Sequence, residues 1–92
     1  MEEQVDKEVR ATIASIITSL KQIEIIGPEE LLLSGGLVDS FDVLHLIPMI
    51  EERCGVIIDG EHISHENFIT INAIARLVCR LKNEETRARK LR

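Results

Sequence analysis

Residues 36–42 read Gly-Leu-Val-Asp-Ser-Phe-Asp, and an apolar pattern with helical spacing follows them directly. The glycine favours a turn, and Asp39 is a residue type that caps a helix by accepting hydrogen bonds from free backbone N–H groups. Ser40 then lies at the exposed start of that helix. Free N–H groups and the helix dipole favour negative charge at this end. The stretch therefore predicts a serine hydroxyl where a phosphate could be held.

The predicted helix runs over residues 40–53, and Asp42 adds negative charge to its first turn. Pro48 lies inside the helix and removes one backbone hydrogen bond, which predicts a kink. Gly55 is expected to end the helix. The positions that should face the core recur at helical spacing and are Val43, Leu46, Ile47, Ile50 and Cys54.

Two further long helices are predicted over residues 4–20 and 71–84, because apolar residues recur there three and four positions apart. Thr70 is a favourable N-cap for the second of them. The core-facing positions are Val5, Val9, Ile13, Ile16, Ile17 and Leu20 in the first helix and Ile71, Ile74, Ala75, Val78 and Leu81 in the second.

The segments between the long helices carry weaker patterns. Residues 60–67 are expected to form a short helix with Ile63 and Phe68 facing inward. Residues 56–58, Val-Ile-Ile, are interpreted as a buried connector, since three residues show no periodicity. Pro28 is expected to begin a further helical turn within a long first loop. Together these elements predict an all-α fold, a four-helix bundle with three long helices and one short helix.

The composition is that of one small domain with an aliphatic core. The 92 residues are 45% hydrophobic but only 2% aromatic, so Ile, Leu and Val must fill the interior, as suits a helical bundle. The net charge of −5 and the scarcity of aromatic residues argue against nucleic-acid binding. No apolar run is long enough to span a bilayer, and no signal peptide opens the chain. Two cysteines are too few for a disulfide framework, so we expect a cytoplasmic protein.

Charge divides the chain into an acidic body and a basic end. Residues 82–92 carry five basic and two acidic side chains, +3 in all, so the rest of the chain carries −8 and the total is −5. We expect residues 1–84 to form the domain and residues 85–92 to be a frayed or disordered basic tail. Basic partners should be attracted to the acidic body.

The histidines and paired acidic residues suggest neither a metal site nor a catalytic site. His62 and His65 stand three positions apart, but no nearby cysteine or further histidine completes a set of ligands. Glu51 and Glu52 are adjacent and point in different directions on a helix, so they do not form an acid–base pair. We therefore expect no bound metal and no catalysis by this chain.

The ordered set of motifs resembles the acyl carrier protein family, which includes aminoacyl and D-alanyl carriers. The similarity covers roughly residues 5–82. The matching residues are Gly36-Leu37-Val38-Asp39-Ser40-Phe41-Asp42, Ile50-Glu51-Glu52, Ile57-Ile58-Asp59 and Phe68-Ile69-Thr70-Ile71. The resemblance implies a bundle of acyl-carrier type in which Ser40 receives 4′-phosphopantetheine from coenzyme A through a separate, Mg²⁺-dependent phosphopantetheinyl transferase. It also implies that the chain is not an enzyme and that partner enzymes act on its cargo.

The resemblance also implies which residues meet partners. Asp39 would meet the transferase. Fatty-acid carriers usually have an acidic residue where His45 stands and no proline at position 48, whereas the long segment 59–70 is more similar to D-alanyl and stand-alone aminoacyl carriers. An interior where cargo could be partly enclosed is expected to be lined by the core residues Leu46, Ile47, Ile50 and Ile63. The stripe expected to face partner enzymes is Phe41, His45, Pro48 and Glu52.

The expected function is to carry acyl intermediates as thioesters to enzymes of fatty-acid, polyketide or related biosynthesis. Two alternatives stay open. One is an aminoacyl or D-alanyl carrier loaded by an adenylating ligase, and the other is a helical interaction module that is never modified. We expect a monomer that binds loading and processing enzymes and neither nucleic acid nor a membrane.

Overall fold

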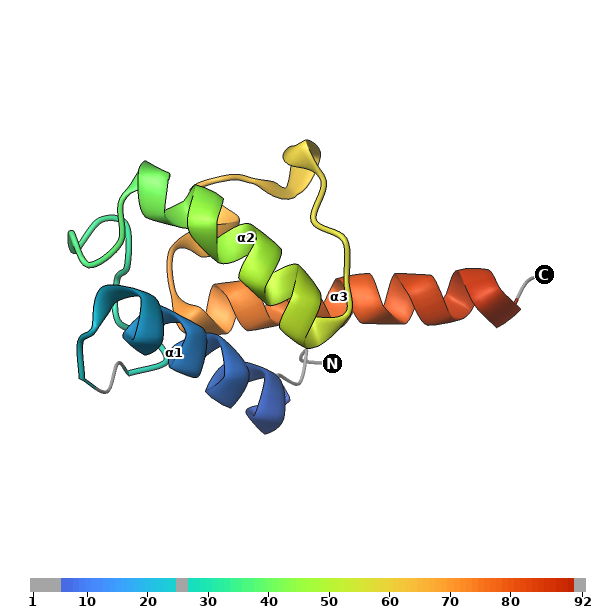
Figure 1. Ribbon diagram of the computed structural model, residues 1–92. Coiled ribbons are helices and arrows are strands. Elements are labelled where there is room, and N and C mark those ends of the chain that lie inside the picture. The colour runs from blue at the N-terminus through green and yellow to red at the C-terminus, as the bar shows by residue number, and fades with distance from the viewer. Residues whose placement is uncertain (1–5, 25–26, 91–92) are drawn as a thin grey trace.

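The computed structural model describes residues 6–24 and 27–90. Within these ranges the chain is all α and contains no strand. Figure 1 shows the order of the elements along the chain, which is α1 (Lys7–Lys21), α2 (Ser40–Cys54), the single-turn 3-10 helices η1 (Gly60–His62) and η2 (Glu66–Phe68), and α3 (Ile71–Lys90). None of the described helices is long and apolar enough to cross a membrane.

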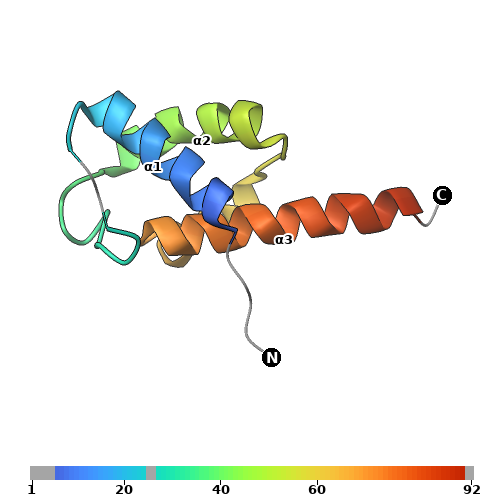
Figure 2. The ribbon, with the colours of Figure 1, turned by 90° about the horizontal axis from the view of Figure 1, so that it is seen from below.

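The three α-helices pack around one aliphatic core. α1 packs against both α2 and α3, and η2 packs against α3. Both ribbon views show the C-terminal part of α3 projecting beyond the other helices (Figures 1 and 2). The backbone of α3 is helical to Lys90, six residues past the predicted end. The domain boundary predicted at residue 84 stays a prediction, and residues 91–92 lie outside the described residues.

The core-facing pattern predicted for α2 is confirmed at each of its five positions, all of which are buried. In α1, Leu20 is only partly buried, and Val5 lies outside the described residues. In α3, Leu81 is partly buried, whereas Leu77, which the pattern missed, is buried. The other predicted positions are buried, namely Val9, Ile13, Ile16 and Ile17 in α1 and Ile71, Ile74, Ala75 and Val78 in α3.

The short helix predicted over residues 60–67 is wrong, because this segment forms two separate 3-10 turns, η1 and η2. The Ser64 hydroxyl accepts a hydrogen bond from the Asn67 backbone N–H, and the Asn67 amide donates to the His62 carbonyl. Such side-chain bonds compete with a continuous helix. Phe68 is buried as predicted, but Ile63 is 40% exposed and does not line the interior.

The first loop is held by backbone hydrogen bonds, and its described residues, 22–24 and 27–39, contain no helix. The Leu32 N–H donates to the Ile69 carbonyl at 2.8 Å, and the Val38 N–H donates to the Leu32 carbonyl at 3.0 Å. The predicted helical turn at Pro28 is wrong, because the chain there makes only a turn. Leu32 is fully buried, and its bond to Ile69, together with the bond from the Asn72 N–H to the Pro28 carbonyl at 3.0 Å, holds the loop against the start of α3.

As predicted, the connector at residues 56–58 does not form a strand. The prediction that this connector is buried is only partly correct, because Val56 and Ile58 are buried while Ile57 is 72% exposed. α2 continues across Pro48, and the kink itself stays a prediction. Pro48 has no N–H to donate to the Leu44 carbonyl. Because Leu44 is exposed, water can reach this side of α2.

The core is expected to respond strongly to loss of packing. Ile16→Ala removes most of a fully buried side chain, so the free energy of unfolding should fall by about 2–5 kcal/mol. Ile57→Ala is the matched control, because the same atoms are removed from a side chain that is 72% exposed, and its effect should stay below about 0.5 kcal/mol. Urea unfolding followed by circular dichroism measures both values. Equal losses in the two variants would contradict this packing.

Candidate functional site

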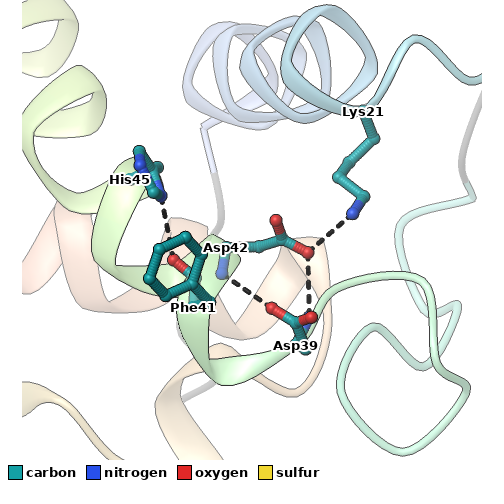
Figure 3. Close-up of polar contacts among 5 residues, drawn as sticks. All are labelled: Lys21, Asp39, Phe41, Asp42 and His45. Carbon is teal, nitrogen blue, oxygen red and sulfur yellow. Dashed lines mark hydrogen bonds and ion pairs between the residues drawn. The ribbon is translucent and has the colours of Figure 1, made fainter.

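The start of α2 is fixed by a pair of reciprocal hydrogen bonds between Asp39 and Asp42 (Figure 3). The Asp42 N–H donates to Oδ1 of Asp39 at 2.8 Å, and the Asp39 N–H donates to Oδ2 of Asp42 at 3.1 Å. This is a capping box, and it confirms Asp39 as the N-cap. Gly36, with φ of +82°, makes the turn that leads into it. Ser40 is therefore held as the first residue of α2.

Ser40 is exposed, and no hydrogen bond from a described residue engages its side chain. Its position at the first turn places it among backbone N–H groups that no carbonyl of the same helix can accept from. The hydroxyl is thus open to an incoming group, and the helix end favours negative charge there. The carboxylates of Asp39 and Asp42 oppose a further negative charge here, because they lie at the same helix start.

Lys21 joins this network from the last turn of α1. Its Nζ lies 2.7 Å from Oδ2 of Asp42, the same oxygen that accepts from the Asp39 N–H. The hydrogen bond from Lys21, helped by that from the Asp39 backbone, lowers the pKa of Asp42 below its ordinary value. The hydrogen bond to Asp42 in turn raises the pKa of Lys21. Both groups therefore stay charged around neutral pH.

A largely apolar groove of about 610 Å³ lies beside Ser40. One end is formed by the helix start itself, and the outer wall comes from the segment between η1 and η2. Ile63 forms part of that wall, which accounts for its exposure. Sequence patterns could not reveal the groove, because its lining comes from three separate segments. The lining residues are Leu33, Gly36, Val38, Asp39, Ser40, Val43, Leu44, Ile63, Ser64, His65 and Phe68.

The stripe predicted on α2 is exposed at all four positions. Phe41 is 68% exposed, and Figure 3 shows it beside His45, whose Nδ1 lies 3.0 Å from the Phe41 carbonyl oxygen. The two rings lie 5.0 Å apart in an edge-on arrangement. Leu44, which the sequence analysis missed, is 61% exposed and adds apolar surface between the stripe and the groove. Its place one helical turn after Phe41 was the available signal.

The structure places two of the histidines in different surroundings from those that the sequence analysis considered. His65 lies 3.4 Å from the Ser34 hydroxyl. His62 instead stands in a group with Asp59 and Glu61, whose possible ligand atoms lie within 4.8 Å of one another. Both acidic residues of the group are exposed. Cys54 is buried, and this burial raises the pKa of its thiol, so it behaves as the small core residue that was predicted.

The lowered pKa of Asp42 predicts a specific pH dependence of stability. Because this pKa is lower in the folded chain than the value of about 3.9 typical of unfolded chains, ionised Asp42 stabilises the fold. The contribution is complete above that value and is lost as the pH falls through the folded pKa. Asp42→Asn, which can still accept the capping bond, should lower the melting temperature at pH 7 but hardly at pH 2.

The matched control is Glu24→Gln, because Glu24 is exposed and no hydrogen bond or ion pair from a described residue engages its side chain. Its melting temperature should follow the wild type at both pH values. Thermal unfolding in low salt provides the measurement. A deficit of Asp42→Asn that is as large at pH 2 as at pH 7 would show that the carboxylate charge is not involved.

Comparison of the chain with protein-family models finds no match, and no curated protein matches it significantly. The resemblance to carrier proteins therefore stays a prediction from the sequence motifs.

Proposed function

We propose that this protein is a phosphopantetheine-dependent carrier protein whose attachment point is Ser40. The observation that supports this most directly is the combination at one place of an exposed, unengaged serine hydroxyl, a rigidly capped helix start and an apolar groove. A helical bundle of acyl-carrier type, in which the two 3-10 turns take the place of the short helix, belongs to the same proposal.

The residues at the start of α2 fit a phosphodiester on Ser40. The capping box uses the N–H groups of Asp39 and Asp42, and the other N–H groups of the first turn have no acceptor in their own helix and could bind phosphate oxygens. Attachment forms a bond between Ser40 Oγ and phosphorus, releases adenosine 3′,5′-bisphosphate from coenzyme A and passes the hydroxyl proton to the transferase. The group would supply a thiol that holds cargo as a thioester. The chain itself contributes the anchor, and partner enzymes carry out the chemistry.

The surface around Ser40 suits recognition by partner enzymes. Phe41 and Leu44 present large apolar side chains that are more than half exposed, and Glu52 extends the same face about two to three turns further along α2. Large exposed apolar side chains flanked by charge are typical of protein-binding surfaces. With an acidic body, the preferred partners are proteins that present lysine and arginine, for which charge speeds the encounter. These enzymes would act in fatty-acid, polyketide or related biosynthesis.

The aminoacyl or D-alanyl carrier remains a second candidate, and the groove provides a reason. The interior beneath Ser40 is closely packed, with Val38, Leu46 and Phe68 each at most 2% exposed, so the space beside the serine lies at the surface. Ser64 and His65 add polar groups to its far wall. A short cargo with a polar end suits this surface. Mass spectrometry of the loaded protein distinguishes an aminoacyl adduct from a longer acyl chain.

Removing the Ser40 hydroxyl should abolish modification completely. Wild-type protein incubated with coenzyme A, Mg²⁺ and a broad-specificity phosphopantetheinyl transferase should gain the mass of one phosphopantetheine group, and Ser40→Ala should gain none. Ser34→Ala and Ser64→Ala are the controls, since both serines are exposed but neither begins a long helix. Intact-mass spectrometry gives the result. An unmodified wild type would favour the interaction module, and an adduct on another residue would exclude Ser40.

The exposed stripe on α2 should affect partner encounter and leave the chemistry unchanged. Glu52→Lys reverses a charge on this face, so the KM of the transferase for the carrier should rise several-fold at low salt while kcat changes little. Glu24→Lys is the control, because it makes the same charge change at an exposed position outside α2. Steady-state kinetics at two salt concentrations measures both variants. Equal effects of the two substitutions would mean that only net charge matters.

A further inference from the structure

Modification of Ser40 would place three negative groups within one helical turn. Asp39 and Asp42 are already there, and each is held by a hydrogen bond to the backbone of the other. The helix dipole favours negative charge at this end, but like charges in one turn repel each other. Stable attachment of a phosphodiester therefore calls for a cation close to the turn.

The structure supplies that cation from a different helix. Lys21 Nζ and the Asp39 N–H share a single acceptor, Oδ2 of Asp42, at 2.7 Å and 3.1 Å (Figure 3). Two short contacts, from Lys21 to Asp42 and from the Asp39 N–H to Asp42, thus connect the ammonium group to the residue that precedes Ser40.

The position of Lys21 is set by the fold. It is the last residue of α1, whose preceding turn is fixed in the core by Ile17, and Gln22 then ends the helix with a left-handed backbone at φ of 56°. The Lys21 side chain is 31% exposed and the Asp42 side chain 17% exposed, so water screens their contact only in part. The capping bonds between Asp39 and Asp42 do not require Lys21. Lys21 therefore adds a positive charge beside the turn without being a partner in either capping bond.

We propose that Lys21 offsets the negative charge introduced at Ser40 and so allows the start of α2 to carry a phosphodiester beside two carboxylates. This role rests on the proposed function for its biological meaning. It makes Lys21 a positioning residue, since the lysine acts on the attached group through the local field and through Asp42. A lysine that only ties α1 to α2 would stabilise the protein equally whether or not Ser40 carries charge.

A thermal-stability cycle tests the proposal without any transferase. Ser40→Glu places a carboxylate where the phosphate would begin, and Ser40→Gln is its neutral counterpart. The charge-specific effect is the melting temperature of Ser40→Glu minus that of Ser40→Gln. We expect this difference to be about 3 °C more negative when Lys21 is replaced by Met than when Lys21 is present. High salt should shrink the gap, and Lys21→Arg should behave like the wild type.

The control for net charge is Lys7→Met, which removes a lysine from the opposite end of the same helix and should leave the difference unchanged. A second measurement keeps Lys21 in place: its pKa, from NMR titration of the side-chain carbon, should be higher in Ser40→Glu than in Ser40→Gln. Equal charge-specific effects in both backgrounds, or an unchanged Lys21 pKa, would overturn the proposal.

Enzymatic modification extends the test to the phosphodiester itself. Modification should lower the melting temperature more in Lys21→Met than in the wild type. If mass spectrometry finds no adduct on Ser40, the carrier function fails, while the Ser40→Glu cycle still decides the role of Lys21. If the adduct forms and shifts both proteins equally, the role of Lys21 fails and the carrier function stands.

Discussion

The reciprocal hydrogen bonds between Asp39 and Asp42 determine the residue at which α2 begins. The direction in which each later side chain of the helix points follows from this first residue. With the first helical residue fixed at Ser40, Val43 turns inward, and Phe41 and His45 turn outward. A start displaced by one residue would rotate the whole pattern by about 100°. It would then take four of the five core side chains of α2 out of their core positions. One capping motif thus sets both the packing of α2 and the surface that it exposes.

The elements that sequence analysis predicted well are those encoded by local chemistry. A capping residue, a run with helical spacing and a terminating glycine lie close together in the chain, so the bounds of α2 and its buried face follow from neighbouring residues. The same holds for Thr70, whose hydroxyl accepts from the Ala73 N–H at 3.0 Å and so caps α3 as expected. Tertiary packing and local propensity agree in these places.

The features that sequence analysis missed depend on contacts between distant parts of the chain. Ile63 reads as a core residue, but polar side-chain bonds at Ser64 and Asn67 divide its segment into two turns and leave it on the rim of a groove. The contact of Lys21 with Asp42 joins residues 21 positions apart. No spacing rule could have identified that contact, because it arises from the way α1 packs against α2.

Leu32 links the first loop to the body of the protein in two directions, since its N–H bonds to the Ile69 carbonyl and its own carbonyl accepts from the Val38 N–H. These two bonds join the residue directly before Thr70, the cap of α3, to the residue directly before Asp39, the cap of α2. The beginnings of two helices are therefore connected by one short mechanical path through a fully buried leucine. A displacement of the start of α3 would thereby act on the backbone two residues before Ser40, without any contact with the serine itself.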